Sequence, residues 1–162
     1  MHEVLNIPWL CTMVVLVLSA CWDYQTHRIP NFITFPALII GLVTTPYFNS
    51  YAEIAPRLIF ILILFVLGGL CIMGLGDIKL LMGVAAFQGV LATLIAITIA
   101  DVMIIMRQLI KNPKSGIEDI KTGLLVLNLR DASLIDKAKT VSFAPYLLTG
   151  FIGYTLGALL LI

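Results

Sequence analysis

Residues 54–73 read IAPRLIFILILFVLGGLCIM, and Arg57 is the one charged side chain in this stretch. A helix needs roughly 17 to 25 mostly apolar residues to cross the hydrocarbon core of a bilayer. The stretch therefore predicts a transmembrane helix. Hydrophobic residues make up 60% of the chain and charged residues 12%, with a mean hydropathy of +1.07, which excludes an ordinary soluble domain.

Further apolar stretches lie on both sides of this one. They run from Leu5 to Cys21, Phe32 to Phe48, Ile78 to Phe87, Val90 to Met106 and Phe143 to Ile162. The stretch that begins at Ile78 is short for a crossing and could be re-entrant. However, residues 78–110 would form about 50 Å of helix, which is too long for one crossing. We therefore predict an all-α fold, a polytopic membrane bundle of about six transmembrane helices, with a turn at Gln88 and Gly89.

The basic residues predict the orientation of this bundle. If the loops at Arg28 and Lys79 and the segment from Arg107 to Lys139 face the cytoplasm, every basic residue except Arg57 lies inside. Such a bias is typical of inner or cytoplasmic membrane proteins. We predict a multi-pass protein of the cell membrane with both termini outside. Residues 1–162 would form one membrane-embedded domain, with a cytoplasmic segment at about residues 108–142 that contains an amphipathic interfacial helix.

The charge balance and the cysteines exclude several classes of partner. Ten Lys and Arg against nine Asp and Glu leave no electrostatic case for nucleic-acid binding. Cys11, Cys21 and Cys71 lie in or at the ends of apolar stretches, without CxxC spacing, so they indicate neither a disulfide framework nor a zinc site. We expect no metal and no cofactor, and a lipid bilayer as the surrounding medium.

Two aspartates stand at ends of apolar stretches that face the same side of the predicted bundle. Asp23 follows the first stretch and Asp77 precedes the fourth. Peptide hydrolysis without a metal or a covalent nucleophile needs one carboxylate as a base toward water and one carboxylic acid to protonate the carbonyl oxygen. Neighbouring carboxyls can share a proton and supply both roles. Asp23 and Asp77 are therefore candidate catalytic residues, while the simpler alternative makes each a helix-end charge or cap.

The glycines next to Asp77 are candidate substrate-binding residues. Gly74 and Gly76 can take φ above zero and present bare backbone, so an extended peptide could approach the carboxylate. Asp77 would then open a helix, whose N-terminal dipole favours an anion. At the start of the second apolar stretch, Asn31 could cap the helix with its side-chain oxygen.

Three stretches carry a resemblance to a known family. Asp23 is followed by RIPNFIT at residues 28–34, GLGDIKL stands at residues 74–80, and VSFAPY stands at residues 141–146. In this order they resemble the first motif, the GxGD motif and the segment opening the last span of the type IV prepilin peptidase family, which are intramembrane aspartic proteases. The resemblance covers nearly the whole chain.

The resemblance implies an aspartic endopeptidase with Asp23 and Asp77 as its catalytic pair at the cytoplasmic face. Its substrates would be type IV pilin-like precursors, cut between a short basic leader and the hydrophobic helix that follows. Two-domain members of the family also carry a methyltransferase region with a four-cysteine zinc motif, and this sequence has neither. It resembles the short, peptidase-only form, associated with tight-adherence pili or archaeal surface filaments, and we expect no N-methylation of the product.

Asp101 lies in the middle of an apolar stretch and matches none of these motifs. An ionisable residue at that depth is a candidate for function. We expect a structural polar contact to Gln88, Thr93 or Thr98, or to another helix. Two alternatives to a peptidase remain: a small membrane transporter or channel subunit with Asp101 and Asp77 on an ion pathway, and a catalytically idle pilus-assembly scaffold.

Overall fold

The computed structural model describes residues 6–48, 51–69, 74–111 and 142–160, and the regular structure in these ranges is entirely helical. The elements are α1 (Ile7–Thr26), α2 (Asn31–Phe48), the 3-10 turn η1 (Tyr51–Glu53), α3 (Ile54–Gly69), α4 (Leu75–Gln88), α5 (Val90–Lys111) and α8 (Ala144–Leu160). Three segments, Ile7–Thr26, Tyr51–Gly69 and Val90–Arg107, are long and apolar enough to cross a membrane, and α2 and α8 are shorter apolar helices. The prediction of an all-α bundle of membrane type is confirmed.

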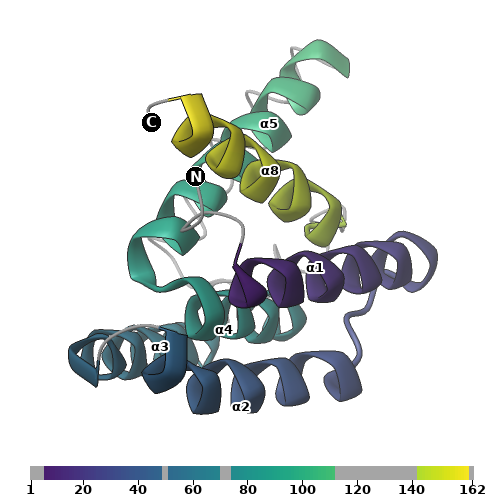
Figure 1. Ribbon diagram of the computed structural model, residues 1–162. Coiled ribbons are helices and arrows are strands. Elements are labelled where there is room, and N and C mark those ends of the chain that lie inside the picture. Colours follow the sequence, from purple (N-terminus) through teal and green to yellow (C-terminus); the bar gives the residue numbers. More distant parts are fainter. Residues whose placement is uncertain (1–5, 49–50, 70–73, 112–141, 161–162) are drawn as a thin grey trace.

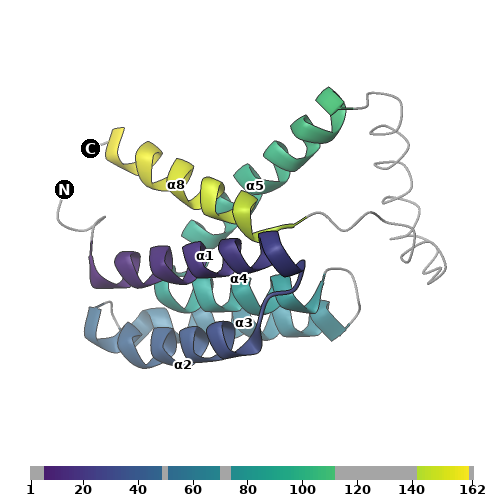
Figure 2. The same ribbon diagram turned by 90° about the vertical axis from the view of Figure 1, so that its right-hand side faces the viewer.

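The helix α4 lies at the centre of the bundle. It packs against α1, α2, α3 and α5, and every residue from Leu80 to Phe87 is buried. Figure 2 shows α1 to α4 running alongside one another, with α5 and α8 crossing over them. At 1.5 Å per residue, the 14 residues of α4 are about 21 Å long. Because protein surrounds this helix, its length does not have to match the bilayer.

The ends of α1 have clear local causes. Asn6 caps its start, since its Oδ1 accepts a hydrogen bond from the backbone N–H of Trp9 at 3.1 Å, and Pro8 lies in the first turn, where no N–H is needed. At the other end His27 takes a left-handed conformation with φ 50°, and its N–H donates to the carbonyl of Asp23 at 2.9 Å. The chain therefore leaves α1 directly after the turn that carries Asp23.

Arg57 caps the C-terminal end of α4. Its guanidinium is buried and donates to the carbonyl oxygens of Ala86 at 2.8 Å and Phe87 at 3.1 Å, and to Oγ1 of Thr45 at 3.2 Å. These carbonyls belong to the last turn of a helix, where no intrahelical donor is available. Gly89, with φ 85°, then turns the chain into α5. The predicted turn at Gln88 and Gly89 is confirmed. The hydrogen bonds of Arg57 to the end of α4 are a structural reason for this residue to lie apart from the other basic residues.

A glycine allows α5 and α8 to approach closely where they cross. A Cβ added at Gly150 would overlap the carbonyl oxygen of Ala96 and lie 3.2 Å from the backbone nitrogen of Ala100. Figure 2 shows α5 and α8 crossing above α1 and spreading apart toward their C-terminal ends. Backbone contact of this kind is typical of helix pairs in membranes, where small residues bring helices together.

One expectation about local structure needs correction. Asn31 is the first residue of α2 rather than its cap, and its Oδ1 accepts a hydrogen bond from Nζ of Lys79 at 2.9 Å. Residues 108–111 continue α5 beyond the apolar span that ends at Arg107, and the cytoplasmic segment at about residues 108–142 stays a prediction. The amphipathic helix expected further on falls in residues 112–141, outside the described residues, and the single domain over residues 1–162 stays a prediction.

Candidate active site

Three helix ends meet at one end of the bundle. Figure 2 shows the C-terminal end of α1 near the N-terminal ends of α4 and α8, and α1 packs against both of these helices. Asp23 lies in the last turn of α1 and Asp77 in the first turn of α4. The two aspartates predicted from sequence therefore stand on neighbouring, packed elements.

Asp23 is held by the start of α8. Its side chain is buried, with 4% of the residue exposed. Its Oδ2 accepts a hydrogen bond of 3.1 Å from the backbone N–H of Ala144, the first residue of α8. The first N–H groups of a helix have no intrahelical acceptor and carry partial positive charge, so they are suitable partners for an anionic oxygen. Asp23 acts as a cap of α8 that comes from another helix.

A second contact joins the same two segments. The hydroxyl of Ser142 is hydrogen-bonded to the backbone carbonyl of Asp23 at 3.3 Å and to Nδ1 of His27 at 2.8 Å. His27 is the residue that ends α1. The turn carrying Asp23 is therefore attached to the entry of α8 through both its side chain and its backbone.

Asp77 folds back over the residue that precedes α4. A Cβ at Gly74 would lie 2.9 Å from Oδ2 of Asp77, so a side chain at residue 74 would require the carboxyl to shift from this position. Gly74 is the N-cap of α4 and supplies no side-chain hydrogen bond. The Asp77 side chain is half-buried, next to the start of its own helix.

Burial raises the pKa of Asp77 from its ordinary value of 3.8 to about 6, and the negative charge of Asp23 contributes to the same shift. Asp77 directly precedes the apolar stretch that begins at Ile78, so it lies at the boundary of the apolar region. The helix dipole favours an anion here, but burial and the neighbouring charge outweigh it. Asp77 therefore keeps its proton at pH values where an ordinary aspartic acid has lost it.

The two glycines do not use the conformational freedom that the sequence suggested. Gly74 has φ −58°, and Gly89 is the glycine with positive φ among the described residues. The space beside Gly76 is filled, because a Cβ there would lie 3.3 Å from Cβ of Ile29. Gly76 thus lets the loop between α1 and α2 pack onto α4. A role of Gly74 and Gly76 in substrate binding stays a prediction.

Asp101 does not make the polar contact expected of it. Gln88 donates to Oγ1 of Thr12 at 2.9 Å, and the hydroxyls of Thr93 and Thr98 each donate to the backbone carbonyl four residues earlier. The Asp101 side chain is exposed on α5 and has no hydrogen bond or ion pair with the described residues. It lies about three helical turns beyond the start of α5, away from the start of α4 that carries Asp77.

Ala144, Ser142 and His27 are the site residues that the sequence did not single out for a role. The stretch at residues 141–146 was recognisable as a motif, and a helix start close to Asp23 was predictable from the topology. The contact itself uses the backbone N–H of Ala144, which has no residue-type signature. Within the described residues, no group of three or more His, Cys, Asp and Glu side chains could hold a metal ion.

The fold and the two carboxyls together define an all-helical bundle of membrane type with a pair of acidic groups at one end. A family model, described as the type IV leader peptidase family, matches residues 10–107. The match covers more than half of the chain and includes both Asp23 and Asp77, so the chain belongs to the type IV leader peptidase family. It is a protease of that general type. No match was found among curated proteins or solved structures.

Proposed function

We propose that this protein is a membrane aspartic endopeptidase that removes the short basic leader from type IV pilin-like precursors, using Asp23 and Asp77 to activate water. The observation that carries the proposal is the placement of Asp23 in the last turn of α1 and Asp77 in the first turn of α4, on two helices that pack together. Burial, and after it the charge of Asp23, raises the pKa of Asp77 to about 6, which suits one carboxyl of the pair to hold a proton while the other is ionised. Family membership supports a peptidase over the transporter alternative.

The contacts of the two aspartates suggest different roles. Asp23, bonded to the N–H of Ala144, is the base, and Asp77, which holds its proton, is the acid. Asp23 takes a proton from water as the water oxygen bonds to the scissile carbonyl carbon, while Asp77 gives its proton to the carbonyl oxygen. The product of this step is a neutral tetrahedral diol with a protonated Asp23 and an ionised Asp77.

The second step restores both carboxyls. Asp23 passes its proton to the leaving nitrogen as the carbon–nitrogen bond breaks, and Asp77 recovers a proton from the diol as the new carboxylic acid forms. Each aspartate therefore ends in the state in which it began. No metal ion or covalent intermediate enters this scheme.

The active end of the bundle would face the cytoplasm in the cell membrane. Arg28 lies in the loop between α1 and α2, Lys79 in the second turn of α4, and Arg107 in the last turns of α5. Figure 2 has these helix ends on one side of the molecule, and Arg57, the exception, is buried. The positive-inside bias supports this orientation. A basic leader would then be cut on the side where the precursor is made.

Cleavage of a purified precursor tests the proposal. The protein in detergent is incubated with a type IV pilin precursor that carries its leader and its whole apolar helix, and the products are measured by mass spectrometry. We expect one cut, between leader and helix, by the wild type and equally by Asp101→Asn, which removes a carboxyl far from the pair. The absence of any cut, or a cut inside the helix, would overturn the proposed function.

A further inference from the structure

The seam between the packed helices α1 and α4 has the two aspartates at one end. At its other end the side-chain amide of Gln88 donates to Oγ1 of Thr12 at 2.9 Å. Thr12 lies eleven residues before Asp23 in α1, and Gln88 lies eleven residues after Asp77 in α4. Eleven residues are close to three helical turns, so each aspartate shares the face of its helix that carries the contact between Thr12 and Gln88. Asp23 and Asp77 therefore both face this seam.

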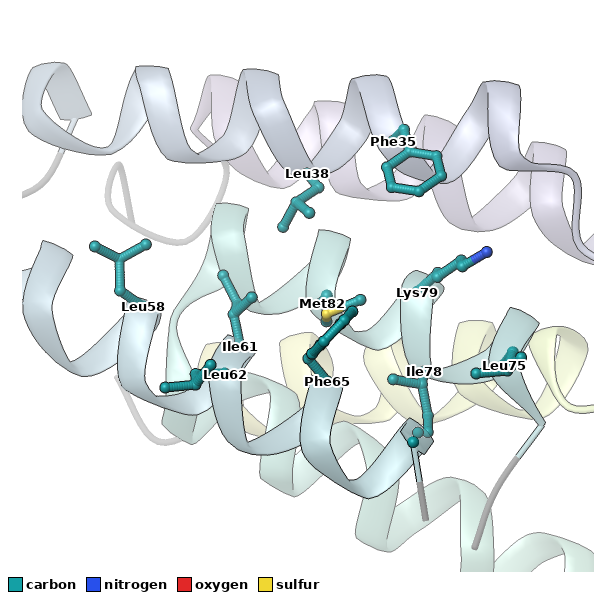
Figure 3. Close-up of a pocket in the computed structure, with 12 residues that line it drawn as sticks. Phe35, Leu38, Leu58, Ile61, Leu62, Phe65, Leu75, Ile78, Lys79 and Met82 are labelled. Carbon is teal, nitrogen blue, oxygen red and sulfur yellow. The ribbon is translucent and has the colours of Figure 1, made fainter. Parts of the chain in front are cut away.

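The outer face of α4 is a different surface. Figure 3 shows Leu75, Ile78 and Met82 on α4 beside an apolar groove of about 480 Å³ between α2 and α3. Asp77 does not line this groove, because helical spacing puts it on the opposite side of α4. The surroundings of the two carboxyls are therefore those of the seam with α1.

Ser19 lies in this seam, one helical turn before Asp23. It is 0% exposed, and its Oγ makes no hydrogen bond with the described residues. A spacing of four residues places Ser19 and Asp23 on the same face of α1, with their Cβ atoms about 5 to 6 Å apart. Side chains on a helix tilt toward its N-terminus, so the carboxyl of Asp23 leans in the direction of Ser19.

A buried hydroxyl without a partner is unusual in this protein. Most hydroxyls on the described helices donate to a backbone carbonyl three or four residues earlier, namely those of Thr12, Thr26, Thr44, Thr45, Thr93, Thr98, Thr149 and Thr155. Thr34 is a second exception, but it lies on α2, which carries neither carboxyl. Burying an unbonded hydroxyl is unfavourable, so the position of Ser19 beside Asp23 points to a role in the reaction.

A second oxygen beside Ser19 is also available. Oδ2 of Asp23 accepts from the N–H of Ala144, while Oδ1 has no hydrogen bond with the residues that the structure describes. A buried water typically makes about three hydrogen bonds to polar groups that lack other partners. Oγ of Ser19, Oδ1 of Asp23 and the carboxyl of Asp77 are three such groups at one end of the seam.

We propose that Ser19, together with Asp23, holds the water that cleavage consumes. The inference rests on the proposed function, because it adds a third group to the same site. The water donates one hydrogen bond to Oδ1 of Asp23 and one to Oγ of Ser19, which leaves a lone pair of its oxygen for the scissile carbonyl carbon. Asp23 takes the first proton as the carbon–oxygen bond forms. The second hydrogen stays on the new hydroxyl, and Ser19 neither gains nor loses a proton.

Ser19→Ala and Thr12→Val separate this role from a structural one. Both remove a buried hydroxyl from the same face of α1, but only that of Thr12 has partners. We expect Ser19→Ala to lower kcat about 10- to 100-fold, because the water loses its orientation, and to leave KM unchanged. Its melting temperature should equal or exceed that of the wild type, since no hydrogen bond within the protein is lost.

Thr12→Val should show the reverse pattern. Its melting temperature should fall, because the amide of Gln88 loses its acceptor, while kcat stays at the wild-type value. A Ser19→Ala variant with the kcat of the wild type would overturn the inference and leave the proposed function standing. A fall in kcat that comes with a lower melting temperature would show that Ser19 is structural, and would overturn it too.

Infrared spectroscopy gives a reading that needs no substrate. The O–H stretching band of a bound water shifts when the solvent is labelled with oxygen-18, whereas that of a serine hydroxyl does not. We expect one such band in the wild type and in Thr12→Val, and its loss in Ser19→Ala. Identical spectra for the wild type and Ser19→Ala would overturn the inference. If the wild type cuts no precursor, the proposed function fails, and the band still decides whether Ser19 holds a water.

Discussion

Oδ2 of Asp23 accepts a hydrogen bond of 3.1 Å from the backbone N–H of Ala144. Asp23 lies in the last turn of α1 and Ala144 begins α8, so this contact joins two helices that are more than a hundred residues apart in the chain. Ala144 also lies outside residues 10–107, the range matched by the family model. The last helix is therefore part of the candidate site in this protein.

Ala144→Pro tests this contact directly, because proline lacks the N–H and is well tolerated in the first turn of a helix. A hydrogen bond to a charged group contributes about 1.5 to 3 kcal/mol, so we expect kcat to fall by roughly 10- to 100-fold. Ala144→Gly, which keeps the N–H, is the matched control and should retain most activity. Equal rates for the proline and glycine variants would show that the N–H has no role.

The raised pKa of Asp77 predicts how cleavage depends on pH. The proposed acid must be protonated, so kcat/KM, which reports on the free enzyme, should fall as pH rises through about 6. Bound substrate buries Asp77 further, so the corresponding fall in kcat should lie at higher pH. Infrared spectroscopy should detect a protonated carboxyl that titrates near pH 6 and is absent from Asp77→Asn. A titration near pH 4 would contradict the account.

The same shift has a consequence for stability. Because the pKa of Asp77 is higher in the folded protein than its ordinary 3.8, the folded state binds this proton more tightly, and stability falls as pH rises from about 4 to 6. Each pKa unit corresponds to about 1.4 kcal/mol, so the loss is at most about 3 kcal/mol, and partial exposure to solvent reduces it. Asp77→Asn should therefore melt above the wild type at pH 7 and together with it below pH 4.

The lengths of the apolar stretches and the positions of the charged residues were enough to predict the helical bundle and the turn at Gln88 and Gly89. They also predicted that Asp23 and Asp77 lie at the same end of the bundle. These features follow from local sequence, because bilayer thickness and loop charge act on each segment separately. The partner of a polar side chain depends on packing between helices instead. Asn31 could have capped its own helix, but α4 brings Lys79 within 2.9 Å of its side chain.

The contact of Asp23 could not be predicted for a related reason. Its partner is a backbone N–H, present in every residue except proline, and only the docking of α8 selects Ala144. That Asp101 has no polar partner among the residues that the structure describes also depends on tertiary structure. The three polar residues near it in sequence all bond elsewhere, with Gln88 reaching across to Thr12 on α1.

Arg57 should be a major contributor to stability. Arg57→Met would leave the buried carbonyl of Phe87 without its donor and remove one of the two donors to the carbonyl of Ala86, which also accepts from Thr45, at a cost of about 2 to 4 kcal/mol. We expect the melting temperature in detergent to fall by at least about 5 °C. Ile59→Met changes an exposed residue of the same helix and should have little effect. Similar melting temperatures for the two variants would be inconsistent with a capping role.

The crossing of α5 and α8 should be sensitive to one methyl group. Gly150→Ala places a Cβ against the backbone of Ala96 and Ala100, so we expect a loss of about 1 to 3 kcal/mol from overpacking. Gly157→Ala lies in the same helix with no atom within 4 Å of its Cβ, and it should be neutral or slightly stabilising. Thermal unfolding in detergent compares the two, and a Gly150→Ala variant as stable as Gly157→Ala would argue against this packing.

Single asparagine substitutions test the paired role of Asp23 and Asp77 most directly. Precursor cleavage is measured for Asp23→Asn, Asp77→Asn and the double variant, with folding checked by thermal unfolding. If the carboxyls act as a unit, each single substitution should lower kcat by at least about 10³-fold, and the double variant should be little worse than either, because such effects are not additive. A folded single variant that cleaves the precursor at close to the wild-type rate would contradict the account.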